Sequence, residues 1–282
     1  MTDAGPGLGV GYPPSRHILR ALGFEVEHRP DLTSTAHIPV GPHLRDTSGV
    51  VTTGALATLV DATGGGLAAG AAHPDWIATA DLTLHLLGPV HASTVVAHGR
   101  VIRRGRTTVV LGVDLTDEHG TGLGTATMSF AVLPRRDGNP VVEMAIEPVR
   151  FAFTPVDDEP LAPLADGIGI TLDGTAAVAP MSPFVVNTLG AMQGGAVASL
   201  AAAATTAAAD VEIGRPTVCV DLGINYLTFG KAGPIRAVPR VLRAEADWCL
   251  VAVEVRDEGN EDRLMTVARA VAVVPTGTGA TR

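Results

Sequence analysis

One stretch of this sequence occurs twice, and the repeat constrains the fold more than any other feature. Residues 46 to 61 read DTSGVVTTGALATLVD, and residues 187 to 202 read NTLGAMQGGAVASLAA. At an offset of 141 positions the copies share small and apolar residues, among them Gly54 with Gly195 and Leu59 with Leu200. A repeat of this kind predicts two units of one architecture in the chain.

The two copies differ at polar positions. The first copy ends in a carboxylate, Asp61, where the second has Ala202. The second copy instead holds two amide side chains and a glycine pair, which are Asn187, Gln193, Gly194 and Gly195. Each copy therefore carries one half of a possible site.

Length and charge limit the classes of function. The 282 residues are 46% hydrophobic, which is enough for two ordinary domains with real cores. The net charge of −9 and the pI of about 5.4 make nucleic acid and anionic membranes poor partners, and only RVIRRGR at 100 to 106 is basic. Aromatic residues, at 4%, are too scarce for a base-stacking platform.

The chain carries no sign of export or membrane insertion. Cys219 and Cys249 show no metal-like spacing, and two cysteines do not indicate a disulfide scaffold. The N-terminal residues lack the charged and apolar regions of a signal peptide, and no run of about 18 apolar residues predicts a membrane span. We expect a cytoplasmic protein.

Hydrophobic periodicity predicts a long helix over residues 53 to 72. Its apolar face consists of Leu56, Leu59, Val60, Thr63 and Leu67. Three successive glycines, 64 to 66, weaken an isolated helix by about 1 kcal/mol each. We expect a closely packed sheet to compensate for them.

Strand patterns surround this helix and recur in the second unit. The first unit has extended segments near 24–28 and 33–40, then strands near 77–87, 93–103, 107–117 and 123–133. The second has strand candidates near 168–180, a helix at about 194–210, and strands near 216–227, 235–244, 247–257 and 263–274. The predicted organisation is a flexible arm at 1–16, a domain at 17–138, a linker at 139–165 with a short strand near 148–153, a domain at 166–275 and a tail at 276–282.

The second copy reads Asn-x-x-Gly-x-x-Gln-Gly-Gly from residue 187, and the first copy has an acidic residue about two turns into its helix. Together they resemble the hotdog-fold thioesterases of the PaaI-like group, which have His where this chain has Gln193. Segments 79–89 and 219–229 resemble the strand after the helix in that family. The resemblance covers residues 20–134 and 168–275. It implies an α+β double hotdog, with two long central helices each wrapped by an antiparallel sheet and the sheets joined edge to edge.

The resemblance also implies an activity, namely hydrolysis of an acyl-CoA to the free acid and CoA. Coenzyme A would enter as part of the substrate, with no other cofactor, and the double units would assemble further into a homo-oligomer. In that family the glycine at the helix start and the Asn hold the thioester carbonyl, and the acidic residue of the partner unit activates water or attacks. The matching residues here are Gly194, Asn187 and Asp61. Thr79 would assist, and Gln193 and Gly195 would contact the substrate.

Helix geometry explains why such a site has to be shared between units. Thr53 and Asp61 are eight residues apart, which is roughly 12 Å along a helix, whereas a base must lie within about 3 Å of the proton that it takes. We therefore expect antiparallel helices that place Asp61 over the free N–H groups of Gly194 and Gly195. The opposite combination, Ala202 and Cys219 with Asp46, Thr52 and Thr53, has no carboxylate at the position of Asp61 and is expected to be inactive.

Plainer interpretations stand beside these functional ones. Asp61 could accept a structural hydrogen bond, Asn187 could cap a turn, and the glycine pair could form a tight turn into the helix. Thr79 is ordinary in a strand, and Cys219 is expected to be a buried strand residue. A hairpin tip rich in arginine could be merely solvated or could contact a CoA phosphate; its residues are Arg103, Arg104 and Arg106.

Other classes of protein remain or are excluded. A non-catalytic acyl-CoA binding protein on the same scaffold is the alternative to an enzyme, whereas a hotdog dehydratase is disfavoured because its helix pattern is missing. The sequence has no Gly-x-Ser-x-Gly elbow and no His-x-x-x-His pair, so it predicts no serine hydrolase and no metal site.

Overall fold

The computed structural model describes residues 12–135, 148–156 and 160–275 of the chain. The first repeat begins with a short helix and ends with a strand that comes from the predicted linker. Its elements are α1 (Ile18–Leu22), β1 (Phe24–His28), β2 (Thr33–Pro39), η1 (Pro42–Leu44), α2 (Thr53–Ala72), β3 (Trp76–Leu86), β4 (Thr94–Arg104), β5 (Thr108–Asp117), β6 (Gly122–Leu133) and β7 (Val149–Phe153).

The second repeat follows the same order. Its elements are α3 (Leu164–Ile168), β8 (Thr171–Asp173), β9 (Ala176–Ala179), α4 (Gly194–Ile213), β10 (Val218–Tyr226), β11 (Ile235–Ala244), β12 (Trp248–Asp257) and β13 (Arg263–Val273). The predicted long helices and most of the predicted strands are confirmed. The segment at 168–180 is a hairpin of two short strands, and the sequence analysis did not predict α1, η1 or α3.

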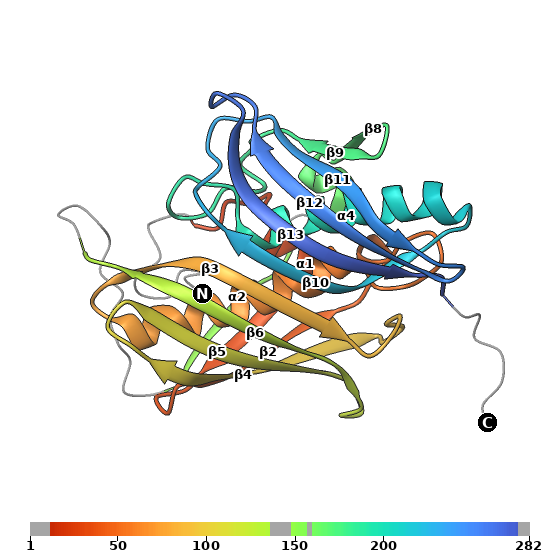
Figure 1. Ribbon diagram of the computed structural model, residues 1–282. Helices are drawn as coiled ribbons and strands as arrows, with labels where there is room; N and C mark the ends of the chain where they lie inside the picture. The colour runs from red at the N-terminus through yellow and green to blue at the C-terminus, as the bar shows by residue number, and fades with distance from the viewer. Residues whose placement is uncertain (1–11, 136–147, 157–159, 276–282) are drawn as a thin grey trace.

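All strands join one antiparallel sheet, whose order is β7-β1-β2-β4-β5-β6-β3-β10-β13-β12-β11-β9-β8. The two halves meet where β3 pairs with β10, with Gly223 opposite Thr83 at the centre of the seam. Figure 1 shows β3 and β10 side by side between the two units, each of which curves around its own long helix. The predicted α+β double hotdog, with sheets joined edge to edge, is confirmed. Edge pairing removes an exposed strand from each half.

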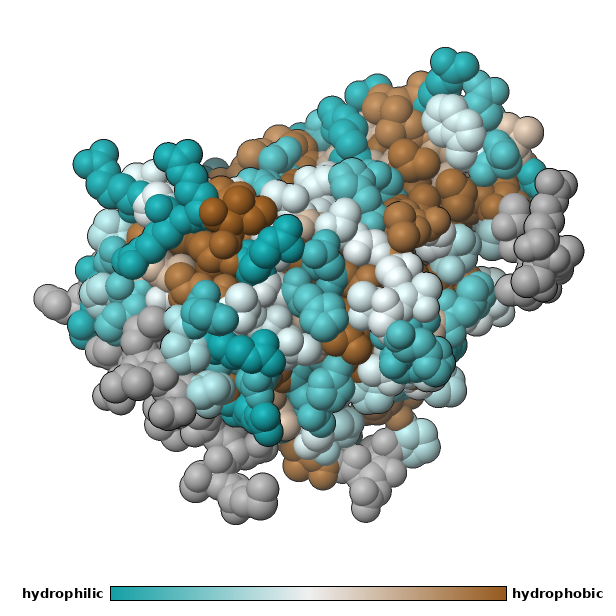
Figure 2. Space-filling view, turned by 90° about the horizontal axis from the view of Figure 1, so that it is seen from below, coloured by the Kyte–Doolittle hydropathy of each residue, from teal (hydrophilic) through white to brown (hydrophobic). Residues whose placement is uncertain are grey.

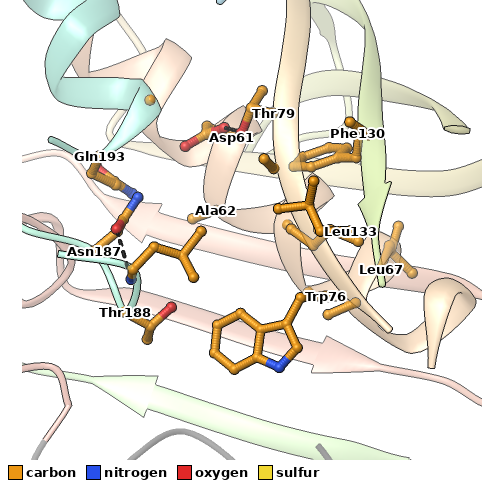
Figure 3. Close-up of a pocket in the computed structure, with 18 of the residues that line it drawn as sticks. Asp61, Ala62, Leu67, Trp76, Thr79, Phe130, Leu133, Asn187, Thr188 and Gln193 are labelled. Atoms are coloured by element: carbon orange, nitrogen blue, oxygen red, sulfur yellow. Dashed lines mark hydrogen bonds between the residues drawn. The ribbon is translucent and has the colours of Figure 1, made fainter. Parts of the chain in front are cut away.

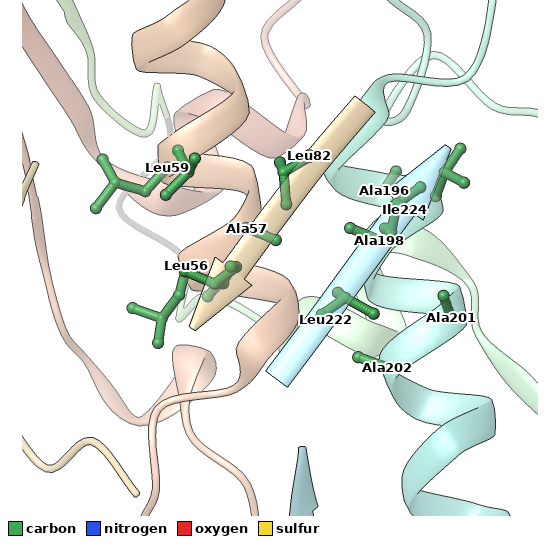
Figure 4. Close-up of a cluster of buried hydrophobic side chains, with 14 of the residues drawn as sticks. Leu56, Ala57, Leu59, Leu82, Ala196, Ala198, Ala201, Ala202, Leu222 and Ile224 are labelled. Carbon is green, nitrogen blue, oxygen red and sulfur yellow. The ribbon is translucent and has the colours of Figure 1, made fainter. Parts of the chain in front are cut away.

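The two long helices run antiparallel and touch at glycines near their first turns. A Cβ on Gly54 would lie 2.9 Å from the Cα of Ser199, and a Cβ on Gly195 would lie 2.5 Å from the Cα of Thr58. Figure 4 shows Leu82, Leu222 and Ile224 of the seam strands beside these helices, and all three side chains are buried. The predicted apolar face of α2, from Leu56 to Leu67, is buried as well.

The glycines of α2 do not all serve the close packing that the sequence predicted. A Cβ on Gly64 would lie 2.7 Å from the Sδ of Met128 in β6, so this glycine admits the sheet. A Cβ on Gly66 would overlap the ring of His28. A Cβ on Gly65 would meet nothing within 4 Å, so Gly65 faces open space.

Both long helices are apolar for reasons of packing. By length and composition alone, α2 and α4 could each cross a membrane, although neither is an uninterrupted run of apolar residues. Most of each helix is buried inside its own sheet, which accounts for the composition. On the face shown in Figure 2, apolar side chains lie in separate patches among hydrophilic ones.

Two predicted boundaries shift in the structure. Residues 12–16 of the predicted arm are held, because the buried Arg20 guanidinium donates hydrogen bonds to the carbonyl oxygens of Pro13 and Pro14. The predicted linker strand exists as β7 and pairs with β1. The rest of the arm, part of the linker and the C-terminal tail lie outside the described residues.

Candidate active site

Asp61 projects from the third turn of α2 and is only 7% exposed. Its Oδ1 accepts a hydrogen bond of 2.9 Å from the hydroxyl of Thr79. Burial raises the pKa of Asp61 to about 6, although the Thr79 hydroxyl and the N–H of Gly195 in the other repeat act in the opposite direction. A carboxyl group with this pKa can accept and release a proton near neutral pH.

A β-bulge aims Thr79 at Asp61. The register of β3 against β6 shifts between Thr79 and Asp81, so one extra residue separates them. Thr79 pairs with the buried Phe130 and faces the helix, whereas Asp81 faces outward and accepts a hydrogen bond from Ser129. In an unbroken strand, residues two apart would share a face. The bulge therefore places the Thr79 hydroxyl inside the molecule.

Gly194 is the first residue of α4 and lies directly against Asp61. A Cβ on Gly194 would be 2.8 Å from Oδ2 of that carboxylate, so the glycine makes the contact between repeats possible. As the first residue of the helix, Gly194 has no intrahelical acceptor for its N–H. The N–H of Gly195 faces Asp61, but Gly195 itself packs against Thr58 and does not line the cavity described below.

Asn187 forms a turn before α4, as the plainer interpretation supposed. Its Oδ1 accepts hydrogen bonds from the N–H groups of Leu189 and Ala191, at 2.9 and 3.1 Å. The oxygen of the amide is thereby engaged, and the NH₂ group is the part of the side chain left to donate into the cavity that Asn187 lines.

Gln193 has an unsatisfied polar atom. It is the N-cap residue of α4, yet its side chain makes no capping hydrogen bond. The residue is only 6% exposed, and its Oε1 is buried without a hydrogen-bond partner. Buried polar atoms are almost always paired in native proteins, so this amide is arranged for a bound water or ligand.

These groups line one cavity of 520 Å³ to which both repeats contribute residues. Figure 3 shows Asp61 and Thr79 from the first repeat, with Asn187 and Gln193 from the second, around the same space. The lining contains eight of the ten aromatic residues of the chain, which are Tyr12, Phe24, Trp76, Phe130, Phe151, Phe153, Tyr226 and Phe229. Scarce aromatic residues are thus concentrated where a ligand could bind.

Tyr226 belongs to this site and the sequence analysis missed it. Its hydroxyl donates a hydrogen bond of 2.9 Å to the carbonyl oxygen of Gly194. Burial, followed by the charges of Asp61 and Asp81, raises the pKa of Tyr226 well above its ordinary value. Period-2 alternation from Leu222 and Ile224 could have placed Tyr226 on the inner face.

The arginine-rich hairpin tip lies elsewhere. Exposed side chains at the turn between β4 and β5 belong to Arg103, Arg104 and Arg106, and none of them lines the cavity. Their contact with a CoA phosphate stays a prediction. Among the residues that the structure describes, no group of three or more His, Cys, Asp or Glu side chains is placed to hold a metal ion.

The equivalent positions at the other end of the helix pair hold different groups. The hydroxyl of Thr53, the first residue of α2, donates a hydrogen bond to the carbonyl oxygen of Cys219. Burial raises the pKa of the Cys219 thiol to about 12, so the thiol stays protonated. With Ala202 at the position that matches Asp61, no carboxylate is supplied there.

The fold and this arrangement define a tandem hotdog protein with a carboxylate in a cavity between its repeats. A family profile described as "Thioesterase superfamily" matches residues 48–123, and one described as "Acyl-CoA thioesterase N-terminal domain" matches residues 185–274. The chain therefore belongs to the thioesterase superfamily, as a thioester hydrolase made of two hotdog domains in tandem. No curated protein sequence gives a significant match.

Solved structures share the fold across nearly the whole chain. The tesB protein of Mycobacterium avium subspecies paratuberculosis is 12% identical, with a TM-score of 0.59 over 92% of this chain and 98% of its own. An acyl-ACP thioesterase of Bacteroides thetaiotaomicron is 12% identical, with a TM-score of 0.54 over 86% and 98%. A hotdog-fold protein of Alicyclobacillus acidocaldarius is 14% identical, with a TM-score of 0.56 over 92% and 98%. At these identities the likeness concerns the fold alone.

Proposed function

We propose that the protein hydrolyses acyl-CoA thioesters at one composite site per chain. The observation that carries this proposal is the contact between the Asp61 carboxylate of the first repeat and Gly194 at the start of α4 in the second. A base and a helix N-terminus that meet in a cavity are the two parts that hydrolysis of a thioester requires. The description of the profile that matches the second repeat supports CoA as the thiol.

In the proposed reaction, the Asp61 carboxylate takes a proton from a water molecule whose oxygen attacks the thioester carbon. Thr79 holds the carboxylate in place through its hydroxyl, and the unpaired amide oxygen of Gln193 accepts a hydrogen bond from the attacking water. Burial keeps the pKa of Asp61 close to 6, so the carboxylate is ionised at neutral pH and is still a useful base.

Charge then develops on the carbonyl oxygen of the tetrahedral intermediate. The N–H of Gly194 and the NH₂ group of Asn187 donate hydrogen bonds to this oxyanion. When the intermediate collapses, the bond between carbon and sulfur breaks and the CoA sulfur takes the proton that Asp61 received. The products are the free acid and CoA, and Asp61 is again a carboxylate.

The test is release of free thiol from acyl-CoAs with short, long and aromatic acyl groups. Wild type should turn over at least one of these groups, and Asp61→Asn should lower kcat by at least 10²-fold. The control is Asp46→Asn, which changes the matching turn of the first repeat and should leave kcat unchanged. If the protein binds acyl-CoA but hydrolyses none, it is a binding protein and the proposal fails.

A single turnover in ¹⁸O-labelled water separates the two routes open to Asp61. Direct attack by water puts the label in the product acid during the first turnover. Direct attack by the carboxylate would instead put the label into Asp61, because water would then hydrolyse a mixed anhydride at the protein carbonyl. We expect label in the product acid, and label in Asp61 would overturn the role of general base.

A further inference from the structure

The cavity continues well beyond the groups that would carry out hydrolysis. From Asp61 it follows one face of α2 whose residues are small, namely Ala62, Gly65, Gly66, Ala69 and Gly70. Asp61 and Gly70 are nine residues apart, which is roughly 13 Å along a helix. Because three backbone bonds span about 3.5 Å, an extended chain of about eleven bonds would fill this length.

Stacked aromatic rings from β1 and β7 also line the cavity. Phe24 of β1 stacks on Phe153 of β7 with ring centroids 6.1 Å apart, and Phe153 stacks on Phe151 at 6.2 Å. These strands pair with each other in the first repeat, and the second repeat has no counterpart of β7 among the described residues. This aromatic part of the lining therefore comes from the repeat that carries Asp61.

The matching face of α4 could not form such a space. At the same offset the second helix has Thr206, Asp210 and Val211 in place of Gly65, Ala69 and Gly70. Val211 is 74% exposed, and Asp210 accepts hydrogen bonds from the N–H and hydroxyl of Thr217. Larger and polar side chains have replaced the small ones that line the cavity.

We infer that the preferred substrate carries an apolar acyl group of about eight or more carbons, which lies along the Gly65 face of α2 and ends against the three phenylalanines. This inference rests on the proposed function and assigns its substrate class. Gly65 leaves open space where any other residue would place a side chain. Each methylene that leaves water for this cavity should raise kcat/KM by up to about fourfold.

The experiment measures kcat/KM for acyl-CoAs with two, four, eight and twelve carbons, in wild type and in Gly65→Leu. Wild type should prefer the eight- or twelve-carbon group over the four-carbon group by at least tenfold. Gly65→Leu should lower that ratio at least tenfold, since its side chain fills the space. Gly65→Ala should lower the ratio less, because it adds only one methyl group. This variant should also keep its fold, because alanine is favourable in a helix.

The matched control is Thr206→Leu, which makes the same change at the equivalent position of α4 and should leave the ratio as in wild type. A wild-type ratio near one, or an equal effect of Gly65→Leu on all lengths, would overturn the inference. Calorimetric binding of the same acyl-CoAs to Asp61→Asn gives a separate result. If wild type hydrolyses none of them but affinity rises with length, the proposed function fails and the cavity assignment stands.

A second inference rests on an independent observation, the hydrogen bond from Tyr226 to Gly194. The carbonyl of Gly194 and the N–H of Gly195 belong to one planar peptide group. Tyr226 holds the carbonyl side of this group, Gly194 lies against the Asp61 carboxylate, and the N–H of Gly195 lowers the pKa of Asp61. When β3 and β10 are aligned at Leu82 and Leu222, the first repeat has Leu86 where the second has Tyr226.

The geometry points to Tyr226 as a positioning residue that fixes the peptide group facing Asp61. Tyr226→Phe keeps the ring and its packing and removes only the hydroxyl. We expect kcat to fall about tenfold while KM stays within twofold, and the acid limb of the pH–rate profile to move to higher pH because the Gly195 N–H stabilises the carboxylate less. Thermal unfolding is measured in parallel. An unchanged acid limb and kcat, or a loss confined to stability, would contradict this role.

Discussion

At one end of the helix pair, Asp61 of α2 lies against Gly194, the first residue of α4. At the other end, the equivalent of Asp61 is Ala202, and α2 begins with Thr53, whose hydroxyl is bonded to the carbonyl of Cys219. The helices, the glycine contacts and the seam strands are common to both ends. The comparison therefore separates what the scaffold needs from what a reaction would need.

The turns before the helices show what the scaffold needs. Asp46 accepts hydrogen bonds from the N–H groups of Ser48 and Val50, and Asn187 accepts the matching pair from Leu189 and Ala191. Both residues make the turn equally well. Only asparagine keeps an NH₂ group that can donate to a substrate, and it occurs on the side of Asp61.

The helix caps also differ between the repeats, and here only the first repeat has the side-chain hydrogen bond. Thr52 caps α2 by accepting a hydrogen bond from the N–H of Ala55, whereas Gln193 leaves α4 without a side-chain cap and keeps a buried, unpaired Oε1. An N-cap contributes about 1 kcal/mol to stability. The second repeat has given up this stabilisation at the residue that faces the cavity, a pattern typical of functional positions.

The largest expected effect comes from closing the gap between the repeats. Gly194→Ala places a methyl group 2.8 Å from the Asp61 carboxylate, so we expect kcat to fall by about 10²-fold or more. Thr53→Ala, at the equivalent position of the first repeat, should leave kcat unchanged. Equal losses in steady-state assays of the two variants would show that both ends of the helix pair are active.

Asn187→Asp gives the second repeat the residue of the first. The turn should persist, because Asp46 forms the same turn, and thermal unfolding should change little. Loss of the NH₂ donor and the added negative charge near the developing oxyanion should lower kcat about tenfold to a hundredfold. The reverse change, Asp46→Asn, serves as the control. Full activity of Asn187→Asp would reduce Asn187 to a turn residue.

Gln193→Thr exchanges the two caps. The new hydroxyl can accept a hydrogen bond from the first turn of α4, so we expect a gain of about 1 kcal/mol in the free energy of unfolding. At the same time kcat should fall about tenfold, because the amide that holds water is gone. Denaturant unfolding and thiol release measure the two effects. A variant that gains stability without losing activity would remove Gln193 from the site.

The smallest effect concerns pH. Asp61 must be ionised to accept a proton, and burial raises its pKa to about 6. Activity should therefore be constant above about pH 7 and fall as pH drops through 6, reaching roughly one tenth at pH 5. The pH dependence of kcat/KM for an acyl-CoA substrate measures this limb. A plateau that extends down to pH 4 would exclude a buried carboxylate as the base.

Much of this protein could be predicted from its sequence. The internal repeat, the 3.6-residue period of the helices and the alternation in the strands predicted the double hotdog, because these patterns are local and independent of distant contacts. Asp61 also stood out from the sequence. A carboxylate on an apolar, alanine-rich helix is costly to bury, and its distance of more than two helical turns from the start of its own helix excludes its use there.

Only the tertiary structure decided which strand residues join the site. Thr79 faces Asp61 because of a bulge, and a shift of one residue moves every side chain of a strand to the opposite face. The hydrogen bond of Tyr226 joins the end of β10 to Gly194 at the start of α4, 32 residues away in the chain. Period-2 alternation can place Tyr226 on the inner face of its strand, but it predicts neither this hydrogen bond nor the bulge beside Thr79.

The cavity, too, depended on contacts between distant segments. Tyr12 from the predicted arm and Phe151 from the predicted linker both line it, together with Gly65 of α2. Local periodicity determines which residues form helices and strands. The volume left between elements depends on how all of their side chains pack together, which the order of residues does not reveal.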